Sequence, residues 1–366
     1  MQRNNHEKNQ EATRQFTICN ACRYCEGFCA VFPSMERLTS FSESDIHYLA
    51  NLCHNCSECY YACQYAPPHE FAINIPQLLA EVRNDSYEKY VWPKKFAKIF
   101  TLNAYLTAGL IVLFTTIFIL LGSLFAGAKI FSPIAGGDFY QLIPHTVLVT
   151  IFGLSFGFSL LSIFMSGLKF WRGTGEKFSI IFSPKILISA IKDILQLKYL
   201  HNSGTGCTYP DEENSNARKW FHHFTFYGFL LCFAATALGT IYHYFLGLTA
   251  PYALMSLPVI FGTVGGVGLI IGPAGLWYLK KKADKAIVDS RKTAMEIAFI
   301  ALLISVSVTG LLLLFLRDTS FLGVTFALHL GTVMAFFILM PYSKFIHGLY
   351  RGLALLKFAI EEAKSR

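Results

Sequence analysis

The chain has 366 residues, of which 54% are hydrophobic and only 15% are charged, and its mean hydropathy is +0.44. These values exclude an ordinary soluble protein, in which about a quarter of the residues are charged. The net charge is +8, but the basic residues are spread over several loops, so the sequence does not indicate nucleic-acid binding.

Residues 1–15 are polar and contain no apolar signal-peptide core. The motif Cys-x2-Cys-x2-Cys-x3-Cys then occurs twice and accounts for eight of the ten cysteines. The two runs are Cys19, Cys22, Cys25, Cys29 and Cys53, Cys56, Cys59, Cys63. Thiolates at this spacing hold three corners of a [4Fe–4S] cube, and in two-cluster ferredoxins the fourth cysteine ligates the other cluster.

We therefore predict two [4Fe–4S] clusters with crossed ligation. The first set is Cys19, Cys22, Cys25 and Cys63, and the second is Cys53, Cys56, Cys59 and Cys29. The alternatives are a disulfide framework and zinc, but zinc takes ligands in two pairs and leaves the third and fourth cysteines of each run without a role. Cys207 and Cys232 lie outside the pattern, and Cys232, in an apolar run, is interpreted as a packed free thiol.

The region around the cysteines has almost no strand pattern. Residues 34–52 are predicted as a helix capped by Ser42 or Ser44, and residues 76–90 as a helix with Pro76 at its start. Residues 1–95 are therefore predicted as a helical, two-cluster ferredoxin-like domain. Iron–sulfur ligation needs reduced thiols, so this domain should face the cytoplasm. His54, between two cluster cysteines, can tune a cluster without ligating it.

The composition changes abruptly at Trp92-Pro93, and we predict a transmembrane domain over residues 96–350 followed by a cytoplasmic tail at 351–366. Six stretches are long enough to cross a hydrocarbon core of about 30 Å, which takes ~20 residues. They are 97–126, 143–169, 219–247, 252–279, 293–316 and 321–347. The fold class is thus mainly α, with a six-helix bundle behind the cluster domain.

Basic residues gather before the first span, in the second and fourth connections and after the last span, whereas the opposite loops contain only Lys129 and Arg317. Positive charge marks the cytoplasmic side, so both termini are expected in the cytoplasm of a bacterial inner membrane. Residues 184–200 place apolar side chains on one helical face, which is typical of a helix lying on the lipid surface, and residues 201–217 are predicted as a loop.

Histidines are the exception to a near absence of ionisable residues inside the spans, where such residues are functional candidates. If the sixth span is one straight helix, His329 and His347 lie about 27 Å apart on one face. In the third span His222 and His243 lie about 31 Å apart with an offset of about 60°, whereas His223 would point almost opposite to His243. His222 is therefore favoured over His223 as the companion of His243.

Because the third and sixth spans run antiparallel, His222 is level with His347 on the cytoplasmic side and His243 with His329 on the outer side. Two bis-histidine sites for haem b follow as a prediction, with a single haem as the simpler version. The alternative is that these histidines bond to backbone or water. His145 has no matched partner and is interpreted as interfacial, with a role at a quinone site as the lesser possibility.

The runs CNACRYCEGFC and CHNCSECYYAC, followed by six spans containing KWFHHFTFYGFLLCF, resemble the tricarballylate utilization protein B family, also called the citrate utilization protein B family. The membrane part resembles, more loosely, the dihaem cytochrome b subunit of respiratory nitrate reductase. The family resemblance implies that all eight cysteines are ligands. It also implies that the reduced flavin of a partner, a tricarballylate dehydrogenase, donates electrons that pass to membrane quinone.

The sequence contains no Gly-x-Gly-x2-Gly unit between a strand and a helix, so the flavin must belong to another chain. The glycines at 262–275 lie in an apolar span and indicate close helix packing. A tricarboxylate transporter would need basic groups at mid-membrane, and a membrane-bound redox sensor would need an output domain; neither is found. We predict an electron-transfer subunit of an oxidoreductase that has no substrate site of its own.

Overall fold

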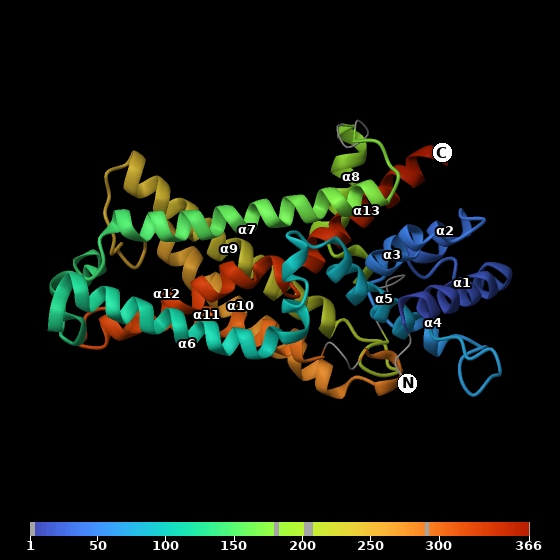
Figure 1. Ribbon diagram of the computed structural model, residues 1–366, viewed down its shortest axis with the longest axis horizontal. Helices are drawn as coiled ribbons and strands as arrows, with labels where there is room; N and C mark the ends of the chain where they lie inside the picture. The colour runs from blue at the N-terminus through green and yellow to red at the C-terminus, as the bar shows by residue number, and fades with distance from the viewer. Residues whose placement is uncertain (1–3, 179–182, 201–207, 290–292, 366) are drawn as a thin grey trace.

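The computed structural model describes residues 4–178, 183–200, 208–289 and 293–365. Thirteen α-helices and no strand element lie in this part of the chain, which confirms the helical fold class. Figure 1 shows an elongated molecule with a bundle of long helices at one end and a small domain of short N-terminal helices at the other.

Five helices build the N-terminal domain, and the sequence predicts only part of them. They are α1 (Asn5–Cys22), α2 (Val31–Glu36), α3 (Glu43–Leu52), α4 (Glu58–Tyr61) and α5 (Ile75–Tyr90). The helix predicted at 34–52 is wrong as a single element, because the chain leaves the helix after α2 and starts α3 afresh. Ser42 begins α3 through a reciprocal capping box with Asp45, so the chain is extended at Ser42. The helix at 76–90 is confirmed as α5, with Pro76 in its first turn.

Within the described ranges, six helices are long and apolar enough to span a membrane, which agrees with the number predicted. They are α6 (Ile99–Ala126), α7 (His145–Gly173), α9 (Ala217–Phe245), α10 (Leu257–Lys282), α11 (Thr293–Phe315) and α12 (Leu322–Leu339). The helices run back and forth along the bundle, so that the α7–α9 and α10–α11 connections and the end of α12 lie beside the N-terminal domain (Figure 1).

The sixth span is shorter than predicted. Helix α12 ends at Leu339, a short 3-10 turn covers Met340–Tyr342, and α13 (Ile346–Lys364) begins after it. Pro341 lacks the N–H that a continuing helix needs, which accounts for the break. His329 and His347 therefore belong to different helices, and the straight-helix geometry predicted for them is wrong. Residues 351–364, predicted as part of a tail, form most of α13.

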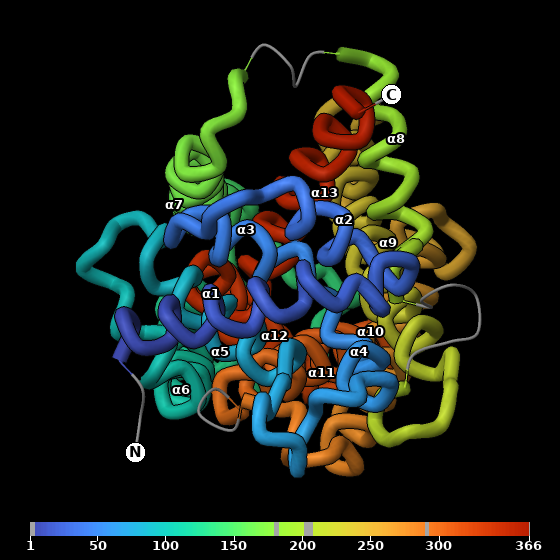
Figure 2. The backbone as a smooth tube through the Cα atoms, turned by 90° about the vertical axis from the view of Figure 1, so that its right-hand side faces the viewer, coloured from blue at the N-terminus to red at the C-terminus, as the bar shows by residue number. Residues whose placement is uncertain are grey.

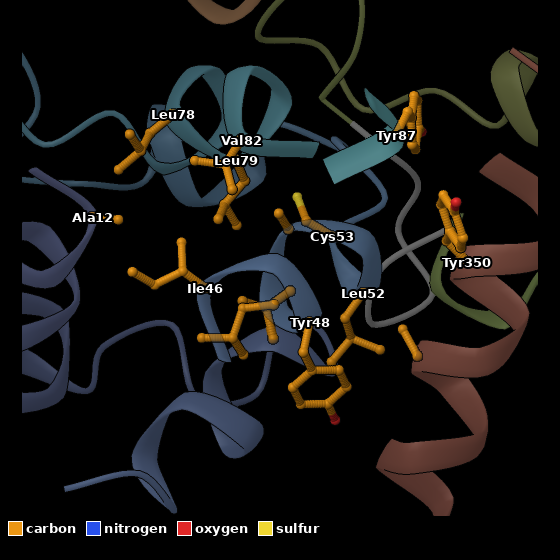
Figure 3. Packing of buried hydrophobic residues seen from close by; sticks show 14 of the residues in the cluster. Ala12, Ile46, Tyr48, Leu52, Cys53, Leu78, Leu79, Val82, Tyr87 and Tyr350 are labelled. Atoms are coloured by element: carbon orange, nitrogen blue, oxygen red, sulfur yellow. The ribbon is translucent and has the colours of Figure 1, made fainter. Parts of the chain in front are cut away.

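Helix α13 leaves the bundle and packs into the core of the N-terminal domain. Figure 3 shows this core, in which side chains of α3 and α5 meet Tyr350 of α13. The rings of Tyr87 and Tyr350 stack with centroids 5.8 Å apart. Glu361 accepts hydrogen bonds from Ser34 and Tyr48 of this domain. In Figure 2 the short N-terminal helices lie across the end of the bundle, so α13 joins the two parts of the molecule.

Helix α8 (Pro184–Leu195) covers most of the segment predicted to lie on the membrane surface. Its apolar face is open, with Leu187, Ile188, Ile191 and Leu195 all exposed. The Tyr227 hydroxyl donates a hydrogen bond to the Leu195 carbonyl over 2.9 Å, which fixes the end of α8 against α9. Of the loop predicted at 201–217, residues 201–207, including Cys207, lie outside the described residues, and 208–216 are non-helical.

Candidate iron–sulfur and histidine sites

Five cysteines drawn from both runs line one cavity of about 250 Å³. Helix α1 supplies two of them from its last turn, and Arg23 then takes up a left-handed φ of 57°, which turns the chain toward the next cysteine. The cysteines are Cys19, Cys22, Cys25 and Cys63, with Cys59 also on the wall. The structure thus brings together the first predicted set.

A second, smaller cavity lies beside the first and is lined by Cys29, Cys53, Cys56 and Cys59, the second predicted set. Asn55 and Ser57 have positive φ values of 56° and 71°, so the chain wraps around the space between the cysteines. The Asn55 N–H donates to Cys53 Sγ over 3.3 Å. Because Cys59 lines both cavities, the two sets are immediate neighbours.

The donor sets fit a positively charged group. Burial, followed by the charges of neighbouring thiols, raises the pKa of Cys19 and of Cys25 to about 12. Burial therefore disfavours free thiolates here, and a cationic metal centre would stabilise them. Backbone N–H groups point at the sulfurs as well: those of Tyr65 and Ala66 at Cys63, and those of Val31 and Phe32 at Cys29. Such hydrogen bonds to sulfur are typical of iron–sulfur sites.

The two cavities differ in their access to water. Cys22 and the neighbouring Tyr24 are exposed at the first, Tyr24 by 67%. Cys53 and Cys56 at the second are only 8% exposed. The first set is therefore open to solvent, whereas the second faces the interior of the molecule.

Three arginines from separate helices hold the loop of the second cavity. Arg83 of α5 and Arg351 of α13 both donate to the Cys53 carbonyl, over 2.7 and 2.6 Å. Arg218 of α9 donates to the Asn55 carbonyl over 2.7 Å. Arg218 and Arg351 lie at the end of the membrane bundle that adjoins the N-terminal domain, so hydrogen bonds connect the second cavity directly to this end of the bundle.

His54 lies buried between the cysteines and this group of arginines. Burial, then the charges of Arg351 and Arg218, lower the pKa of His54 well below its ordinary value. The imidazole is therefore neutral at physiological pH. Its ring is 5.7 Å from that of Tyr199, and both the ring and the arginines face the second set rather than the first.

The structure brings His222 and His347 together, as the sequence predicts. Their ring centroids are 6.2 Å apart. Two imidazoles on opposite sides of one metal, each bonded at about 2 Å, have centroids about 6 Å apart. Nδ1 of His347 is bonded to the Lys344 carbonyl and must carry the proton, since a carbonyl only accepts, so Nε2 keeps its lone pair. Nδ1 of His222 is buried and lacks a hydrogen-bond partner. The two ring planes are inclined by 68°, and the pair is a candidate for one bis-histidine site.

The histidine pair and two of the arginines share helical faces. Arg218 and His222 are four residues apart on α9, and His347 and Arg351 are four residues apart on α13. Residues at this spacing are neighbours on a helix surface. Two of the three arginines that hold the Cys53–Asn55 loop, Arg218 and Arg351, are therefore one turn away from the histidines, and the second cavity and the histidine pair are adjacent.

The outer histidines are arranged differently from the prediction. The ring of His243 stacks on that of His145, with centroids 3.9 Å apart and planes inclined by 24°. His329 instead has Nδ1 3.1 Å from the Thr309 hydroxyl. Among the described residues no ring contact joins His243 to His329. Imidazole binds a metal in the ring plane, so two rings stacked face to face do not bracket an iron.

The prediction that His145 has no matched partner is wrong, because its ring stacks on that of His243. The signal was its place at the outer start of the second span, at the same depth as His243 at the outer end of the third. Cys232 behaves as predicted: it is a free thiol packed at the contact of α9 and α10, where a Cβ on Gly265 would lie 2.9 Å from its Sγ.

Both parts of the chain match a known family. Residues 12–89 match the citrate utilization protein B Fer4-like domain, and residues 99–366 match citrate utilization protein B. Citrate utilization protein B of Escherichia coli is 47% identical over 361 residues, which cover 98% of this chain and 94% of the relative. The chain belongs to the citrate utilization protein B family. No solved structure matches it.

Membership of the citrate utilization protein B family bears directly on the two cavities. The stretch matched to its Fer4-like domain contains all eight cysteines that line them. The match thus favours iron–sulfur groups over zinc, and an electron-transfer role for the family member described here. The second match begins at residue 99, where α6 begins.

Proposed function

We propose that this protein carries electrons from the reduced flavin of a partner dehydrogenase to membrane quinone. The observation that carries the proposal is the continuous series of sites: an open four-cysteine set, a buried four-cysteine set beside it, and the His222–His347 pair one helical turn beyond the arginines. When bound, two [4Fe–4S] clusters and one haem b would supply one-electron transfer at these positions.

The eight cysteines would be the cluster ligands, in the crossed sets Cys19, Cys22, Cys25, Cys63 and Cys53, Cys56, Cys59, Cys29. Crossing ties the two runs to each other, because each set takes its fourth cysteine from the other run. Support comes from the cavity linings, which contain these same groups. The division into a cluster domain at 1–95 and a membrane domain from 96 is part of the proposal.

The partner would dock at the open set. Tyr24 is 67% exposed and Phe71 39% exposed, and Phe71 packs on Tyr65 of the cavity wall. Exposed aromatic side chains beside a redox site are suitable contacts for a transient protein partner. The resemblance of the chain to tricarballylate utilization protein B makes a tricarballylate dehydrogenase the proposed flavoprotein.

His222 and His347 would hold a single haem b. Burial, then the charges of Lys344 and Arg351, lower the pKa of His347 well below its ordinary value, and the neutral imidazole is the form that ligates iron. The contacts of His243 with His145, and of His329 with Thr309, favour one haem over the two predicted.

The orientation in the bilayer is also proposed. Lys280, Lys281 and Lys282 end α10 beside the N-terminal domain, and basic residues are rare in the opposite connections. By the positive-inside rule the N-terminal domain would lie in the cytoplasm of a bacterial inner membrane. This side is reducing, as cluster ligation requires.

The decisive experiment is to purify the full chain in detergent under anaerobic conditions and quantify iron, sulfide and haem. Optical and EPR spectra are then recorded after reduction with dithionite and after addition of a quinone analogue. We expect two interacting iron–sulfur signals, a b-type haem band and reoxidation of both by quinone. Protein that holds zinc in place of iron, or reduced clusters that quinone does not oxidise, would overturn the proposal.

A further inference from the structure

The lipid-facing surface between α9 and α10 contains an apolar groove of about 470 Å³. Its walls include Phe224, Gly228, Val264, Val267, Gly268 and Ile271. The two helices touch closely along its floor: a Cβ on Gly268 would lie 3.1 Å from the Phe224 carbonyl oxygen, and one on Gly228 2.9 Å from that of Gly265. Glycine is required at these positions, because a larger residue would push the two helices apart.

One end of this groove is polar. A second cavity of about 350 Å³ is lined by Gln196, Lys198, Lys219, Leu195, His223 and Tyr227. His223 and Tyr227 line the groove as well, so the two spaces share a wall. Together they have the form of a site for a molecule with a polar head and a long apolar tail.

The polar end lies at the level of the membrane surface. Tyr227 is bonded to Leu195, the last residue of the surface helix α8. Trp220, which also lines the groove, is 62% exposed, and tryptophan is enriched at the boundary between lipid and water. A head group at His223 would therefore be within reach of water, and its tail would lie in the bilayer.

His223 is suited to meet such a head group. Its Nδ1 is buried and has no hydrogen-bond partner. Its ring is stacked on Tyr227, with centroids 5.6 Å apart and planes inclined by 18°. Neighbouring residues differ by about 100° around a helix and their α-carbons lie about 3.8 Å apart. His222 thus faces His347, while His223 faces the groove from the next position.

We propose that the groove is the site of quinone reduction, with a ring carbonyl at His223 and the isoprenoid tail along Val264, Val267 and Ile271. The inference rests on the proposed function and locates the binding site of its electron acceptor. The quinone takes two electrons, supplied one at a time through the chain from the partner's reduced flavin. It also takes two protons from the aqueous side near Lys219. Each ring C=O becomes C–OH, and quinol leaves.

A phospholipid is the other molecule with this general form. Its phosphate would be satisfied by Lys198 and Lys219 and would not require an unpartnered imidazole next to a redox pair. The position of His223 one residue after His222 is what favours quinone.

The binding test uses the full chain in lipid nanodiscs with a photoreactive azido-quinone. After illumination, labelled peptides are identified by mass spectrometry. We expect label within 219–231 and 263–271, and protection by unlabelled quinone. Label on other segments would overturn the site. Label here that anionic phospholipid displaces and quinone does not would show a lipid-binding groove and would also overturn it.

The kinetic test compares Val267→Trp, which fills the groove, with Leu312→Trp, an exposed position on α11 outside it. V267W should reduce labelling and raise the KM for the quinone analogue at least tenfold, while L312W should change neither. His223→Leu should raise that KM about tenfold through the loss of one hydrogen bond. An unchanged KM in both V267W and H223L would contradict the assignment.

Oxidation of the dithionite-reduced protein by ferricyanide separates this inference from the proposed function. Ferricyanide takes electrons at the surface and needs no apolar groove. If the cluster and haem signals are present and ferricyanide oxidises all variants equally, a failure of V267W to affect quinone overturns only the groove. If the signals are absent, the proposed function itself fails.

Discussion

Arg351 of α13 donates a hydrogen bond of 2.6 Å from Nη2 to the backbone carbonyl of Cys53, in the second cysteine set. The same carbonyl accepts from Arg83. Arg351 is also one helical turn beyond His347, so a single side chain lies against both candidate redox sites. Its fixed positive charge would raise the reduction potentials of redox groups bound at these sites.

Replacement of Arg351 by glutamine should lower the reduction potential of the cluster held by the second set. The neutral side chain no longer stabilises the additional electron, and one charge at about 8 Å in a medium of effective dielectric constant about 20 corresponds to a shift on the order of 50–100 mV. Redox titration followed by EPR measures it. Lys364→Gln removes an exposed charge paired with Glu176 and should leave the potential unchanged. A larger shift in the first cluster than in the second would contradict this assignment.

The crossed ligation is tested by single cysteine changes in the full chain. Cys63→Ser should disturb the same cluster as Cys19→Ser, although the two residues belong to different runs, because both line the first cavity. Cys29→Ser should disturb the other cluster, together with Cys53→Ser. Each variant is expected to lose up to about half of the iron if the damaged cluster is released.

EPR spectra identify which cluster is affected, and Cys232→Ser is the matched control, since this thiol lies away from both cavities. If C63S and C53S share one spectral phenotype and C29S and C19S share the other, ligation is confined to each run and the crossing is refuted.

His222→Ala and His347→Ala should each abolish the b-type haem band, because the loss of either imidazole leaves the iron with one protein ligand. His223→Ala should keep it, since this ring faces the α9–α10 groove. The reduced-minus-oxidised optical spectrum and a haem assay provide the measurement. Retention of the band in H222A together with its loss in His329→Ala or His243→Ala would contradict this assignment. It would support the outer pair, His243 and His329, as the haem ligands.

The stability of the N-terminal domain should fall with acidification through His47. Burial, then the charge of Lys89, lower the pKa of His47 from its ordinary 6.5 to about 4, against an opposing effect of Glu43. The unfolded chain binds this proton near pH 6.5 and the folded chain only near pH 4. The contribution is therefore complete above pH 6.5 and is lost as the pH falls toward 4, by at most about 3 kcal/mol.

Thermal unfolding of the full chain, followed between pH 7 and pH 4, tests this expectation. His47→Gln removes the titrating group and should show a flatter dependence of Tm on pH in this window. Parallel curves for the two proteins would show that other groups govern acid unfolding.

The sequence is most informative where a short motif determines the contacts. Each Cys-x2-Cys-x2-Cys run places three thiols around one centre, and the fourth cysteine reaches the other centre because the runs adjoin. The six spans could be predicted for a similar reason, since length and apolarity alone decide whether a helix can cross a bilayer. Both features follow from local sequence and need no knowledge of packing.

The features that escaped prediction depend on chain breaks and tertiary contacts. Helix α1 was missed because its residues are mostly polar, although Asn4 and Glu7 form a capping box at its start. The pairing of His243 with His329 assumed a straight helix through Pro341. The arginines around Cys53 come from three helices that are distant in the sequence. The hydrophobic periodicity of each helix does not show that the three helices come together at this loop.

The contacts of α13 impose an order on biosynthesis. Ser34 and Tyr48 are bonded to Glu361, over sequence separations of 327 and 313 residues. The N-terminal segment leaves the ribosome first, yet its buried core includes Tyr350 and Ala354, which are translated after every membrane span. The core of the domain that carries the cysteines is therefore complete only once the rest of the chain has been made. A truncated nascent chain would present an unfinished fold to the cell's cluster-assembly machinery.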